Sequence, residues 1–310
     1  MAMIKIGHSE VMSTPLGLGT NAVGGHNLFP NLDEEEGKKV FQTALDNQIN
    51  LLDTAFSYGM GRSEELIGEV IQSYNREKIV IATKAAQDPK ADGKINNSPT
   101  FLTQAVDHAL KRLKTDYIDI FYIHFPDKTT PKVEAIDALQ RLKENGKIRA
   151  IGLSNFNLAQ IKEANQEGHV DIIENQYNLL HRDAEKDIMP YLKENQMSFI
   201  PYFPLASGLL TGKYTEIVTF PKNDLRSKNP DFQGARFRAI ITTVNQLKKL
   251  ADEHQATIAE IVLAWYIKNP AISVVIPGAK KVKQVLANVK SLTVQLSNEE
   301  YQFIDSLFQA

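Results

Sequence analysis

The sequence predicts an α/β protein: a single (β/α)8 barrel, or TIM barrel, over residues 1–310, with an N-terminal β-hairpin and extra helices near the C-terminus. Short apolar, β-rich segments alternate with amphipathic helical segments, and the unbroken chain contains eight such strands. The strands are nearly continuous apolar runs, which is typical of parallel strands covered on both faces. A doubly wound parallel sheet is the alternative that has the same alternation.

The predicted elements begin with a hairpin over residues 4–14, which we expect to close one end of the barrel. Amphipathic helices are expected over residues 33–48, 62–73, 100–114, 131–145, 157–167 and 183–195. The eight predicted strands are Leu16–Gly19, Ile49–Asp53, Ile79–Thr83, Ile118–His124, Ile148–Ser154, Ile172–Gln176, Ser198–Tyr202 and Ile272–Ile276.

The ends of several helices carry local signals. Ser98-Pro99 and Thr130-Pro131 each place a capping side chain ahead of a proline at the first helical position. Thr257 with Glu260, and Ser297 with Glu300, have the spacing of a capping box. These signals predict helices that start at defined residues, as the alternating pattern requires.

The alternation breaks between the seventh and eighth strands. Residues 203–235 are rich in proline and glycine and have little helical periodicity, and loops of this length are usually functional or disordered. Two helical stretches, 236–253 and 257–268, then precede the last strand. We interpret them as additions to the barrel and not as a second domain.

Composition excludes several classes of protein. The 310 residues contain 35 Lys+Arg and 37 Asp+Glu, so the net charge of −2 provides no strong field for nucleic acid or an anionic membrane. With no cysteine, the chain has no disulfides, thiolate metal sites or cysteine nucleophiles. The first ten residues do not resemble a secretory signal, and the apolar run Ile261–Ile267 is too short to span a membrane. A cytoplasmic location is expected.

Polar side chains gather where the predicted strands end, and active sites of barrels lie at this end. Asp53 and Lys84 directly follow apolar runs, where an unpaired charge is costly, so we expect them to form an ion pair. An ammonium near Tyr58 would lower the pKa of the phenol, and His124 would hydrogen-bond a substrate oxygen. Together the four residues suit protonation of a carbonyl oxygen or deprotonation of an alcohol. The alternative for each residue alone is a buried polar network that only supports the barrel.

Several segments resemble the aldo-keto reductase family, including the group that contains potassium-channel β subunits. The resemblance runs from Gly17 to Asn288, and its motifs occur in the family's order. The segments that carry it are Leu52–Gly59 (LDTAFSYG), Gly61–Gly68 (GRSEELIG), Ile118–Asp127 (IDIFYIHFPD), Ile148–Phe156 (IRAIGLSNF) and Ile276–Lys280 (IPGAK).

The resemblance implies a (β/α)8 barrel that reduces carbonyl compounds with NAD(P)H and without a metal. It also implies a catalytic tetrad, which falls on Asp53, Tyr58, Lys84 and His124. Hydride would pass from NADPH to an aldehyde or ketone carbon while Tyr58 protonates the oxygen. NADH is the less favoured cofactor. The substrate would be a small carbonyl compound, and the sequence predicts no oligomeric state.

The remaining polar residues at the strand ends suit a nicotinamide dinucleotide. Ser154, Asn155 and Gln176 offer donors and acceptors that match a carboxamide, and Tyr202 is suited to stack on the nicotinamide ring. The other cofactor-binding residues that the resemblance indicates are Gly19, Thr20, Asp53, Phe203, Pro204, Leu205, Ser207, Lys213, Gly278, Lys280, Gln284, Ala287 and Asn288.

Three lysines, Lys280, Lys281 and Lys283, open the last predicted helix. Lysines at a helix N-terminus oppose the helix dipole unless an anion binds there. We therefore predict recognition of a 2′-phosphate, and hence NADPH; the alternative is a solvated surface cluster. Neither Gly17–Gly19 nor Gly59–Gly61 continues into the Rossmann fingerprint, so a Rossmann dehydrogenase is disfavoured. No histidines have the spacing of a metal site.

Two other functions fit the same barrel. One is a cofactor-sensing binding module with little turnover, since the segment from Gly278 also resembles potassium-channel β subunits. The other is an NAD-dependent sugar or polyol dehydrogenase. The loops at residues 21–32 and 203–235 are expected to determine the substrate.

Overall fold

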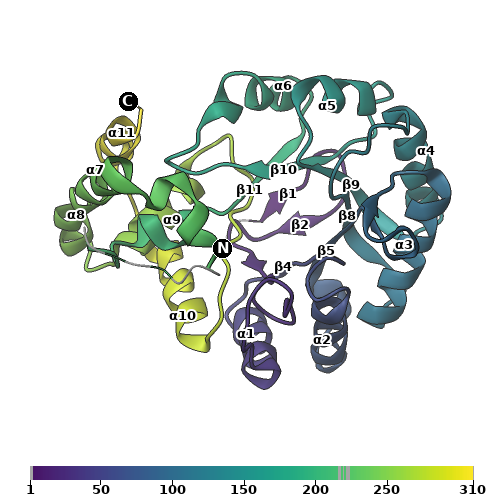
Figure 1. The fold of residues 1–310 in the computed structure, drawn as a ribbon, viewed down its shortest axis with the longest axis horizontal. Coiled ribbons are helices and arrows are strands. Elements are labelled where there is room, and N and C mark those ends of the chain that lie inside the picture. Colours follow the sequence, from purple (N-terminus) through teal and green to yellow (C-terminus); the bar gives the residue numbers. More distant parts are fainter. Residues whose placement is uncertain (1–2, 216–217, 219, 221–223, 310) are drawn as a thin grey trace.

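A computed structural model describes residues 3–215, 218, 220 and 224–309 of the chain. A seven-stranded sheet forms the centre, and each strand pairs in parallel with the next one along the chain (Figure 1). Helices surround this sheet, so the predicted TIM-barrel-like fold is confirmed. The strands are β3 (Leu18–Gly19), β4 (Leu51–Asp53), β5 (Val80–Ala85), β8 (Ile118–Ile123), β9 (Ile148–Ser154), β10 (Ile172–Gln176) and β11 (Ser198–Tyr202).

The eighth predicted strand, Ile272–Ile276, is not a regular strand. Its backbone nevertheless bonds to both edges of the sheet: Ser273 N donates to Phe199 O at 2.9 Å, and Val275 N donates to Pro15 O at 3.0 Å. The pairing reduces to isolated parallel bridges because Pro15 and Pro277 have no N–H to donate. The segment still joins β11 to the chain before β3 and closes the barrel.

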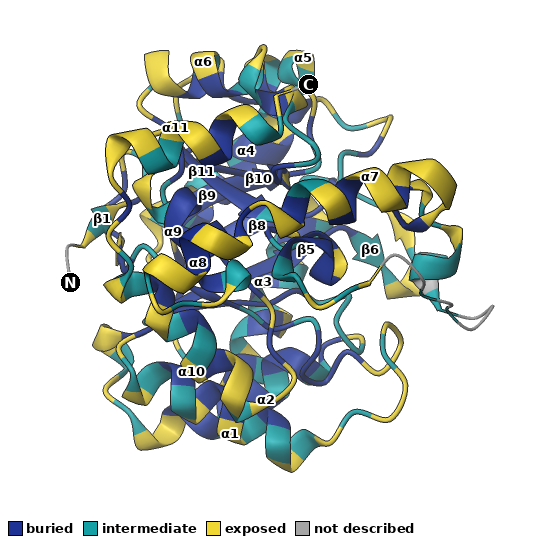
Figure 2. Ribbon diagram, turned by 90° about the vertical axis from the view of Figure 1, so that its left-hand side faces the viewer, coloured by how far each residue is buried: buried dark blue, intermediate teal, exposed yellow. Residues whose placement is uncertain are grey.

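Six helices follow the strands and cover the outside of the sheet. Figure 2 shows that they expose their outer faces and bury their inner ones. Pro131 is the N-cap of its helix and not its first residue, and residues 183–185 form a separate 3-10 turn ahead of the sixth helix. The helices are α1 (Glu34–Asp46), α2 (Arg62–Val70), α3 (Pro99–Leu113), α4 (Lys132–Glu144), α5 (Leu158–Ala164) and α6 (Ile188–Glu194).

In the part of the chain that the structure describes, five further helices follow β11 and gather at one side of the barrel (Figure 1). The predicted helix 236–253 is two helices, because Gln246 N and Leu247 N bond to carbonyls three residues back, which tightens the chain there. Both predicted capping boxes are present. The helices are α7 (Gly234–Asn245), α8 (Lys248–Glu253), α9 (Ile258–Lys268), α10 (Val282–Lys290) and α11 (Asn298–Leu307).

The long segment over residues 203–235 contains 3-10 turns at Ala206–Thr211, Leu225–Lys228 and Pro230–Phe232. Residues 216, 217, 219 and 221–223 of the segment lie outside the described residues. Its described part up to Gln233 contains no α-helix, in line with the predicted lack of helical periodicity, and α7 begins at Gly234. This part includes the residues that follow β11 at the carboxyl end of the barrel.

The predicted N-terminal hairpin is present as β1 (Ile4–Lys5) and β2 (Met12–Ser13). It covers the amino ends of the strands, since Gly7 N donates to the Ser198 hydroxyl at 2.9 Å, at the start of β11. A second hairpin, β6 (Gln87–Asp88) with β7 (Lys94–Ile95), follows β5 and was not predicted, because its strands are too short to show alternation.

The barrel interior is filled by apolar side chains. Towards the carboxyl end, Tyr122 spans this interior over Gly152, where an added Cβ would lie 2.3 Å from the Tyr122 ring. The filled interior leaves the chemistry to the carboxyl ends of the strands. The apolar residues are Ile6, Val11, Leu51, Val80, Ala82, Ile120, Tyr122, Ala150, Ile172, Ile200, Val274 and Ile276.

Candidate active site

A buried lysine lies between two carboxylates at the carboxyl end of the barrel. Lys84 Nζ lies 2.5 Å from Asp53 Oδ1 and 3.2 Å from Glu174 Oε2, and it donates to Thr54 O at 3.0 Å. All three charged residues are at most 2% exposed. The ion pair predicted between Asp53 and Lys84 is therefore confirmed. Glu174 was missed by the sequence analysis, although it is a charged residue in an apolar strand and points the same way as Ile172.

The electrostatics of this group follow from its burial. Burial disfavours the charged form of Lys84, but Asp53 and Glu174 outweigh this effect and raise the pKa of Lys84. Burial also raises the pKa of Asp53, against the attraction of Lys84. One ammonium is thus shared by two carboxylates.

Tyr58 follows β4, beside this group. Lys84 Nζ lies 5.9 Å from the centre of the Tyr58 ring. The predicted direction of the Tyr58 pKa is wrong: burial raises this pKa, and Asp53 and Glu174 add to the increase, although Lys84 opposes it as expected. Tyr58 therefore remains a protonated phenol at neutral pH, the form that can donate a proton.

His124 directly follows β8 and faces Tyr58 edge-on, with the two ring centres 6.4 Å apart. Burial, together with the charge of Lys84, lowers the pKa of His124 to about 3, so the imidazole is neutral at pH 7. Its Nδ1 is buried and has no hydrogen-bond partner among the described residues. A neutral imidazole with a free nitrogen is suited to hydrogen-bond a ligand.

A chain of hydrogen bonds joins β8, β9 and β11 at this end. Asn155 Nδ2 donates to His124 O and to the Ser154 hydroxyl, both at 3.0 Å. The Tyr202 hydroxyl donates to Asn155 Oδ1 at 2.7 Å. Asn155 itself has a φ of 64°, in the left-handed region that asparagine tolerates. Three predicted cofactor residues, Ser154, Asn155 and Tyr202, therefore lie together.

Gln176 lies at the end of β10, and its side chain is exposed. Its neighbour Asn175 joins the network instead, accepting from Asn155 N at 2.7 Å and donating to Phe156 O at 2.8 Å. Gln176 was predicted from its place at the end of the strand, and only the pleat of β10 distinguishes it from Asn175.

The first strand and the seventh contribute loops around the site. Thr20 N donates to Asp53 O at 2.9 Å, and Gly19 pairs with Gly278 across the closing segment. Pro204 O accepts from the buried Tyr266 hydroxyl at 2.9 Å. Phe203 is half exposed. Leu205 and Ser207 belong to the same loop, which has left-handed backbone at Ser207.

Cationic side chains gather around Lys280, which precedes α10. The Lys280 ammonium lies 3.9 Å from the centre of the Phe29 ring. Burial lowers the pKa of Lys280, and like-charge repulsion from Arg226 and Lys213 lowers it further. Arg226 pairs with Asp224 at 2.5 Å. Sequence analysis missed Arg226, which lies in a segment without periodicity. This cluster provides positive charge for an anionic ligand.

The start of α10 differs from the prediction. The helix begins at Val282, so Lys280 precedes it, while Lys281 and Lys283 are exposed. Two backbone N–H groups at and just before its start already have partners: Lys280 N donates to Gln284 Oε1 at 2.9 Å, and Val282 N donates to Glu36 Oε1 at 3.3 Å. The start of α10 therefore offers fewer free N–H groups for a phosphate than expected. The cationic side chains around Lys280 are the stronger reason to expect an anion there. Ala287 and Asn288 lie further along α10.

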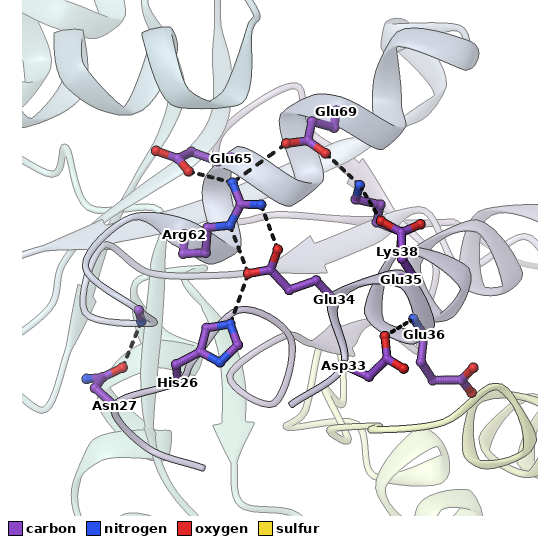
Figure 3. Close-up of polar contacts among 11 residues, drawn as sticks. His26, Asn27, Asp33, Glu34, Glu35, Glu36, Lys38, Arg62, Glu65 and Glu69 are labelled. Atoms are coloured by element: carbon purple, nitrogen blue, oxygen red, sulfur yellow. Dashed lines mark hydrogen bonds and ion pairs between the residues drawn. The ribbon is translucent and has the colours of Figure 1, made fainter. Parts of the chain in front are cut away.

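Asn27, labelled in Figure 3, fastens the first loop, residues 21–32, to the peptide groups that flank Tyr58. Asn27 Oδ1 accepts from Gly59 N at 2.8 Å, and Asn27 Nδ2 donates to Ser57 O at 3.0 Å. Gly59 has a φ of 67°, and an added Cβ would lie 1.9 Å from Gly24 O, so only glycine fits there. One side chain thus holds the peptide groups on both sides of Tyr58.

An ion-pair network anchors the same loop to α1 and α2 (Figure 3). His26 Nε2 lies 2.9 Å from Glu34 Oε1, and Arg62 bonds to both oxygens of Glu34 at 2.7 and 2.9 Å. The Arg62 guanidinium lowers the pKa of Glu34 to about 2. His26 is therefore held to the start of α1 and, through Glu34, to the start of α2.

Residues 15–309 match the model of the aldo/keto reductase family. The chain belongs to this family. It is 35% identical over 312 residues to aldo-keto reductase YhdN of Bacillus subtilis, covering 100% of this chain and 94% of that protein. The NADH-specific methylglyoxal reductase of Escherichia coli is 32% identical, with 100% and 99% covered.

The aldo/keto reductase also resembles proteins with other described roles. A probable voltage-gated potassium channel subunit beta of Oryza sativa is 30% identical, covering 94% of this chain and 90% of that one. The structure of the glycerol dehydrogenase from Gluconobacter oxydans superposes with a TM-score of 0.91 at 33% identity, covering 99% and 95%. The resemblance predicted from the motifs is therefore confirmed, as is membership of a family of oxidoreductases.

Within residues 3–215 and 224–309, no three histidine, cysteine or carboxylate side chains are grouped so as to hold a metal ion. No helix in the described part of this aldo/keto reductase is both long enough and apolar enough to cross a membrane.

Proposed function

We propose that this aldo/keto reductase reduces the carbonyl group of an aldehyde or ketone with NADPH, and that Tyr58 is the proton donor. The observation that carries the proposal is the arrangement of Tyr58 between a buried ammonium and a neutral imidazole. A phenol that stays protonated at neutral pH is suited to general acid catalysis of reduction.

The residues present fit a nicotinamide dinucleotide at two places. Near Tyr58, Ser154 and Asn155 provide a hydroxyl and an amide for a carboxamide, and the Tyr202 ring lies beside them. Along the rim, Lys213, Arg226 and Lys280 provide cations for phosphates. When bound, the reduced dinucleotide supplies the hydride.

The protein's own residues then handle the proton and the orientation of the substrate. His124 hydrogen-bonds the carbonyl oxygen through its neutral ring, and Tyr58 donates its proton to that oxygen. The Lys84 ammonium stabilises the phenolate that remains on Tyr58, while Asp53 holds Lys84 in place at 2.5 Å.

A panel of aldehydes and ketones, assayed separately with NADPH and NADH, tests the proposal. We expect turnover with NADPH that saturates in the carbonyl substrate. Binding of both dinucleotides without turnover of any carbonyl compound would contradict it.

The glycerol dehydrogenase of Gluconobacter oxydans supports a second candidate, an NAD-dependent polyol dehydrogenase, because its structure superposes closely. The same tetrad would serve the oxidation of an alcohol, with the Tyr58 phenolate as the proton acceptor. Oxidation of glycerol and other polyols with NAD+, faster than any carbonyl reduction, would favour it. The potassium channel relative supports a binding module, which the panel above distinguishes by the absence of turnover.

Lys280→Ala is expected to weaken NADPH binding about 10- to 150-fold and to leave NADH binding almost unchanged. Only NADPH has a 2′-phosphate for the lysine to contact, at about 1.5–3 kcal/mol for a charge-assisted bond. The preference for NADPH should decrease as salt rises, because Lys280 is exposed. Fluorescence titration of both cofactors measures this, with Lys283→Ala, in the first turn of α10, as the control. Equal losses for NADPH and NADH would mean that Lys280 only supports its loop.

Asn27→Ala is expected to lower kcat about tenfold and to leave cofactor affinity near the wild-type value. The change removes the two hydrogen bonds that flank Tyr58, and small displacements of a catalytic group are costly. Steady-state kinetics measure the effect. His26→Ala serves as the control, because His26 lies in the same loop but bonds to Glu34. Wild-type kcat in Asn27→Ala would contradict a positioning role.

A further inference from the structure

The buried carboxylate of Glu174 has no place in the proposed tetrad. Glu174 lies on β10, paired in register with Ser154 on β9 and Ile200 on β11, and its side chain is directed into the barrel interior beside Lys84. The residue is 2% exposed, and its Oε2 lies 3.2 Å from Lys84 Nζ. A charged residue at such a position needs compensation.

The groups around Glu174 supply only one positive charge. Lys84 faces it from β5 and Asp53 from β4, and Tyr58, Tyr122 and Tyr202 complete its surroundings. Within the described part of the chain, no cation other than Lys84 pairs with either carboxylate. Two ionised carboxylates with one ammonium would leave a buried net negative charge, so one of the two retains a proton.

The distances identify which carboxylate retains it. Asp53 Oδ1 lies 2.5 Å from Lys84 Nζ and accepts a hydrogen bond from it, whereas Glu174 is 0.7 Å further away. The closer carboxylate gains more from being ionised. Burial and the negative charge of Asp53 both raise the pKa of Glu174 well above its ordinary value. Asp53 is therefore the partner of the Lys84 charge.

We propose that Glu174 is held as a neutral carboxylic acid and is a positioning residue that sets, through Lys84, the acid strength of Tyr58. While Glu174 is neutral, the Lys84 charge is balanced by Asp53 alone and is available to the phenolate. When Glu174 ionises, its negative charge competes for Lys84 and raises the pKa of Tyr58 further. Tyr58 then becomes a weaker proton donor.

The sign of the pH dependence follows. An acid whose pKa is raised loses its proton only as pH rises through that higher pKa. Carbonyl reduction by the wild type should therefore decline on the alkaline side as Glu174 ionises. In Glu174→Gln the side chain is neutral at every pH, so this decline should move to higher pH. The kinetic consequence rests on the proposed reduction, whereas the protonation of Glu174 does not.

Difference infrared spectroscopy of the full-length protein tests the protonation directly. We expect the wild type to show the C=O stretch of a buried protonated carboxyl at neutral pH, and Glu174→Gln to lose one such band. Asp107→Asn is the control, because Asp107 forms a half-exposed surface pair with Lys147 and should leave the band unchanged. A band intensity that is the same in wild type and Glu174→Gln would overturn the proposal. Should Glu174→Gln fail to fold, Glu174→Met, also neutral and of similar length, gives the same comparison.

The pH profile of kcat/KM tests the role through Lys84. The profile of Glu174→Gln is normalised to its own plateau at acid and neutral pH, so that only the position of the alkaline limb is compared with the wild type. Its alkaline limb should lie about one pH unit higher, a tenfold difference in kcat/KM at a fixed pH on that limb. Coincident alkaline limbs would overturn the positioning role. A wild type that turns over no carbonyl compound contradicts the proposed function alone, since the infrared bands are read without turnover.

Discussion

Tyr58→Phe is expected to lower kcat for carbonyl reduction at least about 100-fold, because general acid catalysis contributes about 10²–10⁴-fold. The substitution removes one hydroxyl and keeps the ring, which faces His124 at 6.4 Å. The phenol acts in the transition state and the surrounding packing is retained, so cofactor binding should stay near the wild-type value. Stopped-flow reduction of a saturating aldehyde, together with cofactor fluorescence titration, measures the two quantities.

Tyr74→Phe is the matched control for this substitution. It removes a phenol that bonds to Asp46 at 2.9 Å, away from the strand ends. Kinetics of this variant should equal those of the wild type. Near-normal kcat in Tyr58→Phe would eliminate Tyr58 as the proton donor.

Lys84→Met is expected to abolish most activity and also to lower the free energy of unfolding by about 3–5 kcal/mol, the typical loss when one partner of a buried ion pair is removed. Asp53 and Glu174 would remain buried without a cation. Urea or thermal unfolding measures the loss of stability, and steady-state assays measure the rate.

The stability effect has a sharp control in Lys147→Met. Lys147 pairs with Asp107 at the surface, where both side chains are about two-fifths exposed, and such pairs contribute about 0–1 kcal/mol. Unfolding of Lys147→Met should therefore be nearly unchanged. If Lys84→Met were as stable and as active as the wild type, the buried group around Lys84 would have no role in either property.

Much of the fold follows from local patterns that persist in the structure. Each apolar run from Ile49 to Tyr202 contains a strand, and its neighbour in sequence is also its neighbour in the sheet. Because consecutive parallel strands end at one rim, residues that follow the strands are brought together without further information. This explains why sequence order and motif alone predict that Asp53, Lys84 and His124 lie together at this rim.

The irregular closing segment and the break in the predicted helix 236–253 could not be predicted from the periodicity of apolar residues. Ile272–Ile276 is apolar and bonds to both neighbours, but the prolines at positions 15 and 277 interrupt its ladder. The stretch 236–253 is periodic throughout, yet tightens at Gln246. Patterns of apolar residues report which face is buried, and not which backbone bonds are formed.

The sequence alone determined the order of the elements and the residue types at the rim, since both depend on neighbours in sequence. What required the folded structure was every quantity that depends on distances between strands. The register of β10 places Glu174 at 3.2 Å from Lys84, and Asn27 reaches the peptides beside Tyr58 from another loop. The pKa of Tyr58 rises although Lys84 is near, because desolvation acts in three dimensions and outweighs one favourable charge.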